Sequence, residues 1–322
     1  MSDNNLVVCI GEILIDFFCT DIEVDLKNGT NYVKQAGGAP ANVSAAIAKL
    51  GGKAAFVGTV GNDPFGTYLI ETMNHLHVDT TMILKDDKTK TTLAFVSLKA
   101  NGERDFVFCR GADEQLKLGV LETGKLMAAK ILHFGSATAF LGGNLTETYL
   151  LLMNLAKERG IFISFDPNFR KDLWEGREQE FIELTKVAVS KANFTKVSKE
   201  ELILITGKEN LGEGAKYLHQ LGSKIVAVTL GKEGTFLSSS SGQKIVPSIP
   251  IKSIDSTGAG DGFVGATLYQ LSKEEDPFSI IKNFKRQEEI IRFSNKAGAI
   301  VCTKIGAITA LPTLEEVIFE KK

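Results

Sequence analysis

Short apolar runs alternate with amphipathic stretches along most of this chain. The apolar runs are rich in β-branched residues and end at glycine or polar residues, which predicts buried strands at Leu6–Ile10, Ala54–Val60, Ile161–Phe165 and Ile225–Leu230. Apolar residues at helical spacing predict helices at Pro40–Leu50, Leu145–Arg159, Gly262–Leu271 and Glu288–Val301, and Asp63-Pro64 opens another as N-cap and first residue. This alternation predicts an α/β protein with a mainly parallel sheet.

One region breaks the alternation. Thr91–Lys99 and Asp105–Arg110 both resemble strands, and Asn101-Gly102 between them is a strong hairpin signal, because a type I′ turn needs positive φ at both central positions. With that turn, Phe95 would lie opposite Phe108. One face of the hairpin would then carry five side chains: Leu93, Phe95, Phe106, Phe108 and Arg110.

Such an apolar face must be covered by something. Two interpretations stay open: the hairpin packs on the main core or on a second copy of the chain, or it forms a small β lid that closes over a ligand. The charged segment Thr20–Lys34 could supply further strands to that lid.

Composition narrows the classes of function. Of the 322 residues, 43% are hydrophobic and 24% are charged, as in an ordinary globular protein. The 37 Lys and Arg nearly balance the 39 Asp and Glu, so nothing favours a nucleic acid or an anionic membrane as the partner. Any phosphate site must therefore be built locally, and the 31 glycines indicate many tight turns where backbone could serve.

Cysteine usage and hydropathy indicate the compartment. The four cysteines are scattered and have no zinc-site spacing, so we expect reduced thiols rather than a disulfide framework. No apolar run reaches the ~18 residues of a membrane span, and the first residues are polar. We therefore expect a cytoplasmic protein.

The densest candidate for chemistry is the segment Asp255-Ser256-Thr257-Gly258-Ala259-Gly260-Asp261-Gly262. Because Gly258, Ala259 and Gly260 have little or no side chain, their backbone N–H groups can approach an anion at a helix N-terminus. Asp261 would project beside this anion hole, where it could take a proton from a hydroxyl that attacks a phosphoryl group. We expect the helix dipole to keep Asp261 ionised and only weakly basic.

A dinucleotide site is the competing interpretation of the same segment. Gly260-x-Gly262-x-x-Gly265 formally matches the G-x-G-x-x-G pattern. However, the preceding segment contains Pro247 and Pro250, and about twenty residues further on there is Lys285-Arg286 rather than an acid after a strand. The context therefore disfavours a dehydrogenase.

Two segments near the N-terminus could bind a polyol. The glycine-rich turn Gly37-Gly38-Ala39-Pro40-Ala41-Asn42 is either a plain helix start or a set of backbone amides that binds hydroxyls together with Asn42. Asp16 follows the first strand in an apolar setting, where a carboxylate needs donors. A salt bridge or sugar hydroxyls would both serve.

Three further strand ends carry polar residues. In Asp166-Pro167-Asn168-Phe169-Arg170, Asn168 and Arg170 could reach a nucleotide phosphate at the carboxyl edge of the sheet. Ser198-x-x-Glu201 fits a helix capping box, with a role at magnesium-bound water or phosphate as the alternative. The segment 229–234 has the glycines of a nucleotide-edge loop.

These motifs and their order resemble the ribokinase-like carbohydrate kinases, also called the PfkB family. Segments 37–42 and 255–261 carry the resemblance, which runs from about Val7 to Pro312, and segments 11–17, 166–170 and 196–198 look most like fructokinases. The resemblance implies one three-layer α/β/α domain over residues 1–322. A small β-sheet lid from about 17–36 and 88–112 would be inserted in it.

The resemblance also implies an activity, the transfer of the ATP γ-phosphate to the 6-hydroxyl of D-fructose with Mg²⁺ bound through the nucleotide. Asp261 matches the catalytic base, and Gly258, Ala259 and Gly260 match the anion hole. The implied sugar contacts are Asp16, Gly37, Gly38 and Asn42, together with the lid residues Phe95, Phe108 and Arg110. The implied nucleotide contacts are Asn168, Arg170, Lys196, Ser198, Glu201, Thr229, Gly231, Gly234 and Asn295.

An activating potassium ion is common in this family. Asp255 and Thr257 match part of that site, and the loop Val301–Ala310 would supply carbonyl oxygens, although Ala310 stands where several members carry Ser. The apolar hairpin also permits a lid-to-lid homodimer.

Other functions remain as alternatives at this stage. A kinase of the same family could act on 2-keto-3-deoxygluconate, ribose or a riboside. A catalytically silent sugar- or nucleotide-binding regulator is the alternative from another class, and the intact pairing of Asp261 with residues 258–260 argues against it.

Overall fold

The strands of the main sheet lie mostly side by side in a parallel arrangement, as the alternating pattern predicts. The computed structural model describes residues 5–98, 104–121 and 123–319. Nine strands form the main sheet in the order β13-β12-β11-β10-β9-β8-β1-β4-β5, parallel from β5 to β11 and antiparallel at β12 and β13. Their bounds are β1 Leu6–Ile10, β4 Lys53–Gly61, β5 Asp79–Asp86, β8 Ile131–Phe134, β9 Phe162–Phe165, β10 Phe194–Ser198, β11 Ile225–Thr229, β12 Thr235–Ser239 and β13 Gly242–Val246.

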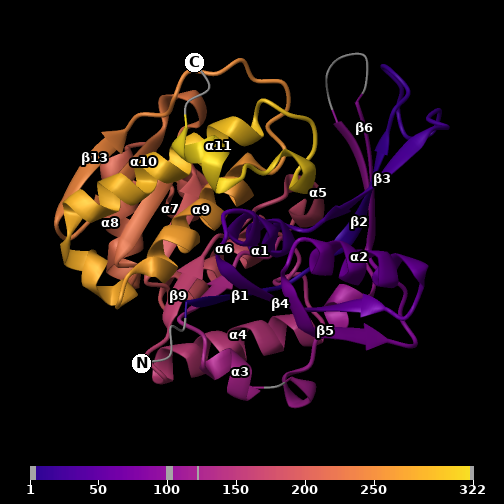
Figure 1. Cartoon of the computed structure of the whole chain (residues 1–322), viewed down its shortest axis with the longest axis horizontal. Coiled ribbons are helices and arrows are strands. Elements are labelled where there is room, and N and C mark those ends of the chain that lie inside the picture. Colours follow the sequence, from indigo (N-terminus) through magenta and orange to yellow (C-terminus); the bar gives the residue numbers. More distant parts are fainter. Residues whose placement is uncertain (1–4, 99–103, 122, 320–322) are drawn as a thin grey trace.

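Helices cover both faces of this sheet (Figure 1). Their bounds are α1 Ala39–Lys49, α2 Pro64–His75, α3 Thr123–Met127, α4 Asn144–Glu158, α5 Lys171–Trp174, α6 Glu178–Val189, α7 Lys199–Thr206, α8 Leu211–Leu221, α9 Ala259–Lys273, α10 Phe284–Val301 and α11 Leu314–Ile318. Alternate residues of β1 point to opposite faces, so Val7 and Cys9 join a buried cluster with α1, α9 and α10. Val8 and Ile10 join a second cluster with α4, α6 and α8. The predicted three-layer α/β/α architecture is confirmed.

A second, smaller sheet projects from one end of the molecule, at the upper right of Figure 1. Its order is β3-β2-β6-β7, with bounds β2 Leu14–Cys19, β3 Tyr32–Gly37, β6 Leu93–Leu98 and β7 Arg104–Cys109. Its strands lie in the two segments from which a small sheet is expected, 17–36 and 88–112, except that β2 begins before residue 17. The described part of the chain contains no helix that is both long and apolar enough to span a bilayer.

The predicted register of the hairpin between β6 and β7 is wrong by one residue. Phe95 lies opposite Val107, and Phe108 lies opposite Ala94. Because side chains alternate across a strand, a shift of one residue places Phe95 on the face opposite to Phe106 and Phe108. There the Phe95 ring stacks on Phe17 at 5.1 Å between centroids. The predicted Asn101-Gly102 turn lies outside the described residues.

The local signals for helix ends are confirmed. The Asp63 carboxylate accepts hydrogen bonds from the N–H groups of Phe65 and Gly66, so it is the N-cap of α2, with Pro64 as the first helical residue. α9 begins at Ala259, three residues before the predicted start, so the 258–261 segment forms the first turn of a helix rather than a loop before it.

Candidate active site

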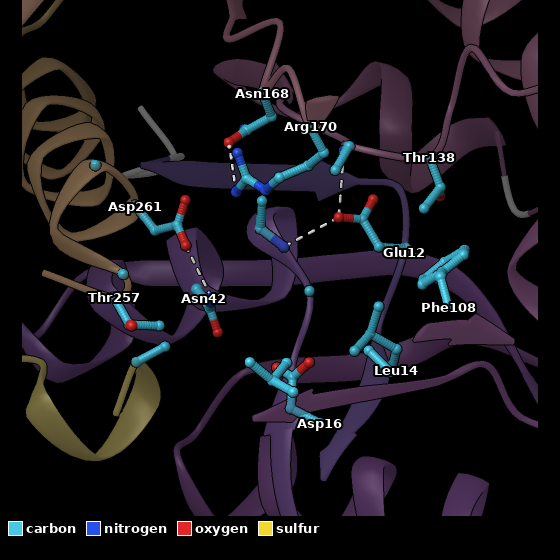
Figure 2. A pocket seen from close by; sticks show the side chains of 18 of the residues that line it. Glu12, Leu14, Asp16, Asn42, Phe108, Thr138, Asn168, Arg170, Thr257 and Asp261 are labelled. Carbon is cyan, nitrogen blue, oxygen red and sulfur yellow. Dashed lines mark hydrogen bonds between the residues drawn. The ribbon is translucent and has the colours of Figure 1, made fainter. Parts of the chain in front are cut away.

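A cavity of about 460 Å³ lies between the carboxyl edge of the main sheet and the small sheet. Figure 2 shows Asp261 and Asn42 on one side of it, Phe108 and Leu14 on another, and Asp16 and Arg170 between them. The small sheet contributes apolar lining from Leu14, Phe18, Ala94, Val96, Phe106 and Phe108. The cavity thus has an apolar wall on one side and ionisable groups on the other.

Asp261 lies in the first turn of α9 and is buried. The Asn42 Nδ2 group of α1 donates to Asp261 Oδ2 at 2.8 Å. Burial raises the pKa of Asp261 to about 6, and the bond from Asn42 and the Arg170 charge limit the rise. Asp261 is therefore largely ionised at neutral pH, as predicted, but it is a stronger base than the helix dipole alone would allow. This is the protonation state and strength that a general base needs.

Gly258 precedes Asp261 as the N-cap of α9, with φ of 76°. A Cβ atom at Gly258 would stand 2.9 Å from Ala307, so both the backbone conformation and the space require glycine. A Cβ atom at Gly260 would stand 3.3 Å from Lys196 Nζ, which places that ammonium beside the helix N-terminus. The N–H of Ala259 donates to Ser256 O at 3.2 Å, so this member of the predicted anion hole already has a partner.

Lys196, at the end of β10, is the buried cation of the site. Its Nζ pairs with Asp166 Oδ2 at 3.0 Å. Burial lowers the pKa of Lys196, but Asp166, Glu201 and Asp261 outweigh it, so the pKa lies above its usual value and the ammonium stays charged. An anion bound at the start of α9 would meet this fixed positive charge.

Asn168 and Arg170 follow β9 and reach the same cavity. Asn168 adopts a positive φ of 47°, and its Nδ2 donates to Gly135 O at 2.7 Å. The Arg170 Nη2 donates to Asn168 Oδ1 at 3.4 Å, as the dashed line in Figure 2 shows. The Arg170 charge lowers the pKa of both Asp16 and Asp261, so this one guanidinium stabilises the ionised form of both carboxylates.

Asp16 lies on β2, beside the glycine-rich turn. Burial raises its pKa to about 7, with Arg170 lowering and Asp261 raising it. Among the described residues, no Lys or Arg nitrogen forms an ion pair with Asp16, which disfavours the salt-bridge interpretation. A Cβ atom at Gly37 would stand 1.9 Å from Asp16 Oδ2, so only glycine leaves room for this carboxylate. Asp16 is thus partly buried and forms no ion pair among the described residues, a state that ligand hydroxyls would relieve.

Ser198 and Glu201 form the predicted capping box of α7. Glu201 Oε2 accepts from the N–H of Ser198 at 2.7 Å, and its Oε1 accepts from the N–H of Phe169 at 2.8 Å. Glu201 therefore also holds the start of the segment that carries Arg170. Burial raises its pKa, and Lys196 lowers it.

A second cavity of about 940 Å³ adjoins the first, and both are lined by Ser256 and Gly260. The second cavity contains the predicted nucleotide residues Thr229, Gly231, Gly234 and Asn295. Asn295 is fixed there, since its Oδ1 accepts from the Thr235 hydroxyl at 2.6 Å and its Nδ2 donates to Val246 O at 2.9 Å. The two cavities meet at the start of α9, which is the arrangement that two substrates exchanging a group would need.

Asp255 and Thr257 tie this junction to the loop after α10. The Thr257 hydroxyl donates to Asp255 Oδ1 at 2.6 Å, and the N–H of Gly306 donates to Asp255 Oδ2 at 3.0 Å. Asp255 is thus already used to join the two loops. Within the described residues there is no group of three or more His, Cys, Asp or Glu side chains that could hold a metal ion.

Three predicted sugar contacts do not line the cavity. Gly37 is absent from the cavity wall, although its neighbour Gly38 is part of it. Phe95 is absent from the cavity wall because of the register shift described above. The Arg110 guanidinium donates to Thr138 O at 3.2 Å and to Gly142 O at 3.0 Å, so it supports the loop after β8 rather than lining the cavity. Sequence reasoning missed Glu12 and Thr138, which do line the cavity. A charged residue two positions after a buried strand, such as Glu12, was the available signal.

This fold and this pair of adjoining cavities suit an enzyme that transfers a group between two bound substrates. The chain matches the pfkB family carbohydrate kinases over residues 4–314. It is 40% identical to Fructokinase-1 of Oryza sativa subsp. japonica, covering 98% of this chain and 97% of that one. It is 39% identical to a probable fructokinase-4 of Arabidopsis thaliana, covering 98% and 96%.

Solved structures agree with this relation. A fructokinase from Xylella fastidiosa with bound ATP superposes with a TM-score of 0.88 at 30% identity, covering 98% of this chain and 97% of that one. A fructokinase from Vibrio cholerae O395, bound to fructose, ADP and calcium, gives 0.83 at 32% identity and covers 98% of both chains. The chain belongs to the pfkB family of carbohydrate kinases, and it is a sugar kinase.

Proposed function

We propose that this protein phosphorylates D-fructose at the 6-hydroxyl with ATP, giving fructose 6-phosphate and ADP. One observation carries the proposal: the buried Asp261, with its raised pKa, lies where a polar cavity of sugar size meets a larger cavity that adjoins the start of α9. The similarity to fructokinases supports fructose as the sugar.

In the proposed reaction, Asp261 takes the proton of the acceptor hydroxyl as its oxygen attacks the γ-phosphorus of ATP, and ADP leaves. Asn42 holds the Asp261 carboxylate in place through its 2.8 Å hydrogen bond. Lys196 and the N–H groups of Gly258 and Gly260 at the start of α9 stabilise the charge that develops on the transferred phosphoryl group. Asp16 and the backbone at Gly38 bind the other sugar hydroxyls, and Gly37 leaves room for the Asp16 carboxylate.

The nucleotide would occupy the second cavity. Thr229, Gly231 and Gly234 border it at the end of β11, and Phe263 and Ala299 add apolar surface that suits a purine ring. Asn168 and Arg170 line the first cavity, and the capping box of Ser198 and Glu201 holds the segment that carries them. Mg²⁺ would arrive with ATP and neutralise charge on the phosphates.

Potassium activation is part of the proposal. A fructokinase from Vibrio cholerae O395 has been solved with fructose, ADP and a potassium ion. Here the Asp255 carboxylate orients Thr257 and Gly306, so their segments stand close enough to offer carbonyl oxygens to one ion. Turnover in potassium, sodium and choline salts at equal ionic strength would measure the dependence.

The small sheet would act as a lid over the sugar. Its residues Phe106 and Phe108 form the apolar wall opposite Asp261, so closure would exclude water and direct the phosphoryl group to sugar rather than to hydrolysis. Val33 and Val107 on the small sheet are exposed, which supports a dimer through this sheet. Light scattering would test that assembly.

A coupled assay of ADP release over a panel of sugars tests the substrate. We expect kcat/KM for fructose to exceed that for ribose, 2-keto-3-deoxygluconate and nucleosides. If kcat/KM is higher for one of those compounds, that compound and not fructose is the substrate. The protein would still be a kinase. ADP release without phosphorylation of any sugar would refute the function itself.

A further inference from the structure

Glu12 is a buried carboxylate to which the proposed reaction gives no role. It lies two residues after the end of β1, it is 1% exposed, and it lines the sugar cavity (Figure 2). A buried charge is costly unless hydrogen bonds satisfy it. The partners of Glu12 therefore show what its charge is used for.

One partner is the N-terminus of α1. The N-cap of α1 is Gly38, which has no side chain to cap the helix, and the first turn contains no acidic residue. Instead, the N–H of Ala39 donates to Glu12 Oε1 at 3.0 Å. Glu12 thus caps α1 from a distant part of the chain and places a negative charge at the positive end of the helix dipole.

The other partner is the loop after β8. The Ser136 hydroxyl donates to Glu12 Oε2, and the N–H of Ala137 donates to Glu12 Oε1 at 3.3 Å. The Ser136 oxygen in turn accepts from the N–H of Ala139 at 2.9 Å. Both carboxylate oxygens are therefore used, and together they join α1 to residues 136–139.

Each of the two joined segments carries a polar residue that lines the cavity. Asn42 of α1 and Thr138 of the loop both line the cavity and are buried. In the part of the chain that the structure describes, neither Asn42 Oδ1 nor Thr138 Oγ1 has a hydrogen-bond partner. Buried polar atoms are normally paired, so these two atoms indicate positions where a bound hydroxyl belongs.

We propose that Glu12 is a positioning residue for sugar capture, which locks α1 to residues 136–139 and so sets the spacing between Asn42 and Thr138. The inference rests on the proposed kinase function. Glu12 acts through these two residues and does not touch the reacting atoms. Burial raises the pKa of Glu12 to about 7. The hydrogen bonds from Ser136, Ala137 and Ala39 limit this rise, because they favour the ionised form of the carboxyl group.

The substitution Glu12→Gln tests the proposal because it keeps the size of the side chain. The Gln amide nitrogen cannot accept the Ser136 hydroxyl proton. It can only donate to a Ser136 oxygen that already accepts from the N–H groups of Thr138 and Ala139, so one of the two connections is weakened. We expect KM for the sugar to rise about ten- to hundred-fold, the range for losing a charge-assisted hydrogen bond, with KM for ATP within about twofold. Ser136→Ala should give a smaller rise, and the double variant should be no worse than Glu12→Gln alone.

Asn210→Ala is the matched control for helix capping. Asn210 caps α8, which has 11 residues like α1, and its Oδ1 accepts from the N–H of Glu213 at 3.0 Å, far along the chain from the cavity residues. This variant should lose thermal stability and keep the sugar KM of the wild type. A merely structural Glu12 would behave in the same way as this control.

Three results would overturn the role of Glu12: an unchanged sugar KM, an equal rise in both KM values, or additive effects of the two single variants. If Glu12→Gln does not fold, the selective effect of Ser136→Ala on the sugar KM decides. Sugar binding is also measured by calorimetry, so the role is tested without turnover. If the wild-type protein does not bind fructose, only the assignment of fructose as the substrate is refuted. The variants are then compared using the sugar that the wild type does bind.

Discussion

Replacing Asp261 by Asn removes the proposed base and changes the shape of the site very little. The Asn side chain can still accept the hydrogen bond that Asn42 donates at 2.8 Å, so α1 should keep its place. A positioned general base typically contributes about 10²- to 10⁴-fold, or about 3–5 kcal/mol of the barrier. We therefore expect kcat to fall at least about a hundredfold, with KM for both substrates nearly unchanged.

The pH profile gives a second, independent measure of the same residue. In the protein without ligands, where its pKa is raised to about 6, Asp261 should be about nine-tenths ionised at pH 7. Because kcat at saturating substrates reports the same ionisation in the enzyme–substrate complex, kcat should fall about tenfold per unit on the acid side of the pKa in that complex. Asp16, whose pKa is raised to about 7, concerns sugar capture and so affects kcat/KM rather than kcat. In Asp261→Asn the acid limb of kcat should vanish. Retention of more than a tenth of the wild-type kcat, or of that limb, would refute the base role.

Three further substitutions follow from the same geometry. Asp16→Asn should abolish sugar turnover. The pKa of Asp16 is about 7 in the folded protein and about 4 in the unfolded chain, so the wild type loses stability as the pH rises from 4 to 7. The substitution should therefore raise the unfolding free energy by up to about 4 kcal/mol at pH 8 and by nothing at pH 4. Lys196→Met should lower kcat about a hundredfold or more and destabilise the fold by about 3–5 kcal/mol by leaving Asp166 unpaired. Gly37→Ala should raise the sugar KM and spare the ATP KM, since its Cβ would displace the Asp16 carboxylate.

Each of these three has its own control. Chemical denaturation of Asp16→Asn at both pH values must show the difference, and equal gains at pH 4 and pH 8 would contradict the raised pKa. The double variant Lys196→Met with Asp166→Asn should recover stability without turnover, and recovered turnover would remove Lys196 from phosphate binding. A Gly37→Ala enzyme with wild-type sugar KM would show that Asp16 does not need its observed position.

Much of the site was predictable because it is built from strand ends and helix starts. Gly258 and Asp261 lie at the start of α9 and Asn42 lies at the start of α1, and both helices begin at glycine-rich turns that the sequence shows. Asn42 reaches Asp261 because α1 and α9 pack against each other. The capping roles of Asp63 and Ser198 are equally local, since a side chain and amides within three residues satisfy one another.

The features that sequence reasoning missed depend on contacts between distant segments. The hairpin register was off by one because phenylalanines occur on both faces of β6 and β7: Phe95 packs on Phe17, while Phe106 and Phe108 face the cavity. The pKa of Asp261 was placed too low because burial between α1 and α9 is a tertiary effect, whereas the helix dipole is a local one. Arg110 was placed in the cavity, but backbone carbonyls of a loop that is distant in sequence hold it.

The distribution of charge in the site explains how one cavity edge can serve both a neutral sugar and a polyphosphate. The Asp16 carboxylate lies beside Gly37, whereas Lys196 lies against Gly260. Hydroxyl donors suit the first end, and phosphate oxygens suit the second. A phosphate would be repelled at the first end, and a sugar would leave the cation at the second end unpaired. Asp261 lies between these ends, held by Asn42 and under the influence of both Arg170 and Lys196. A nearly neutral chain can therefore bind ATP with a few fixed cations and helix amides, while the hydroxyl that reacts is the one that points toward the phosphate end.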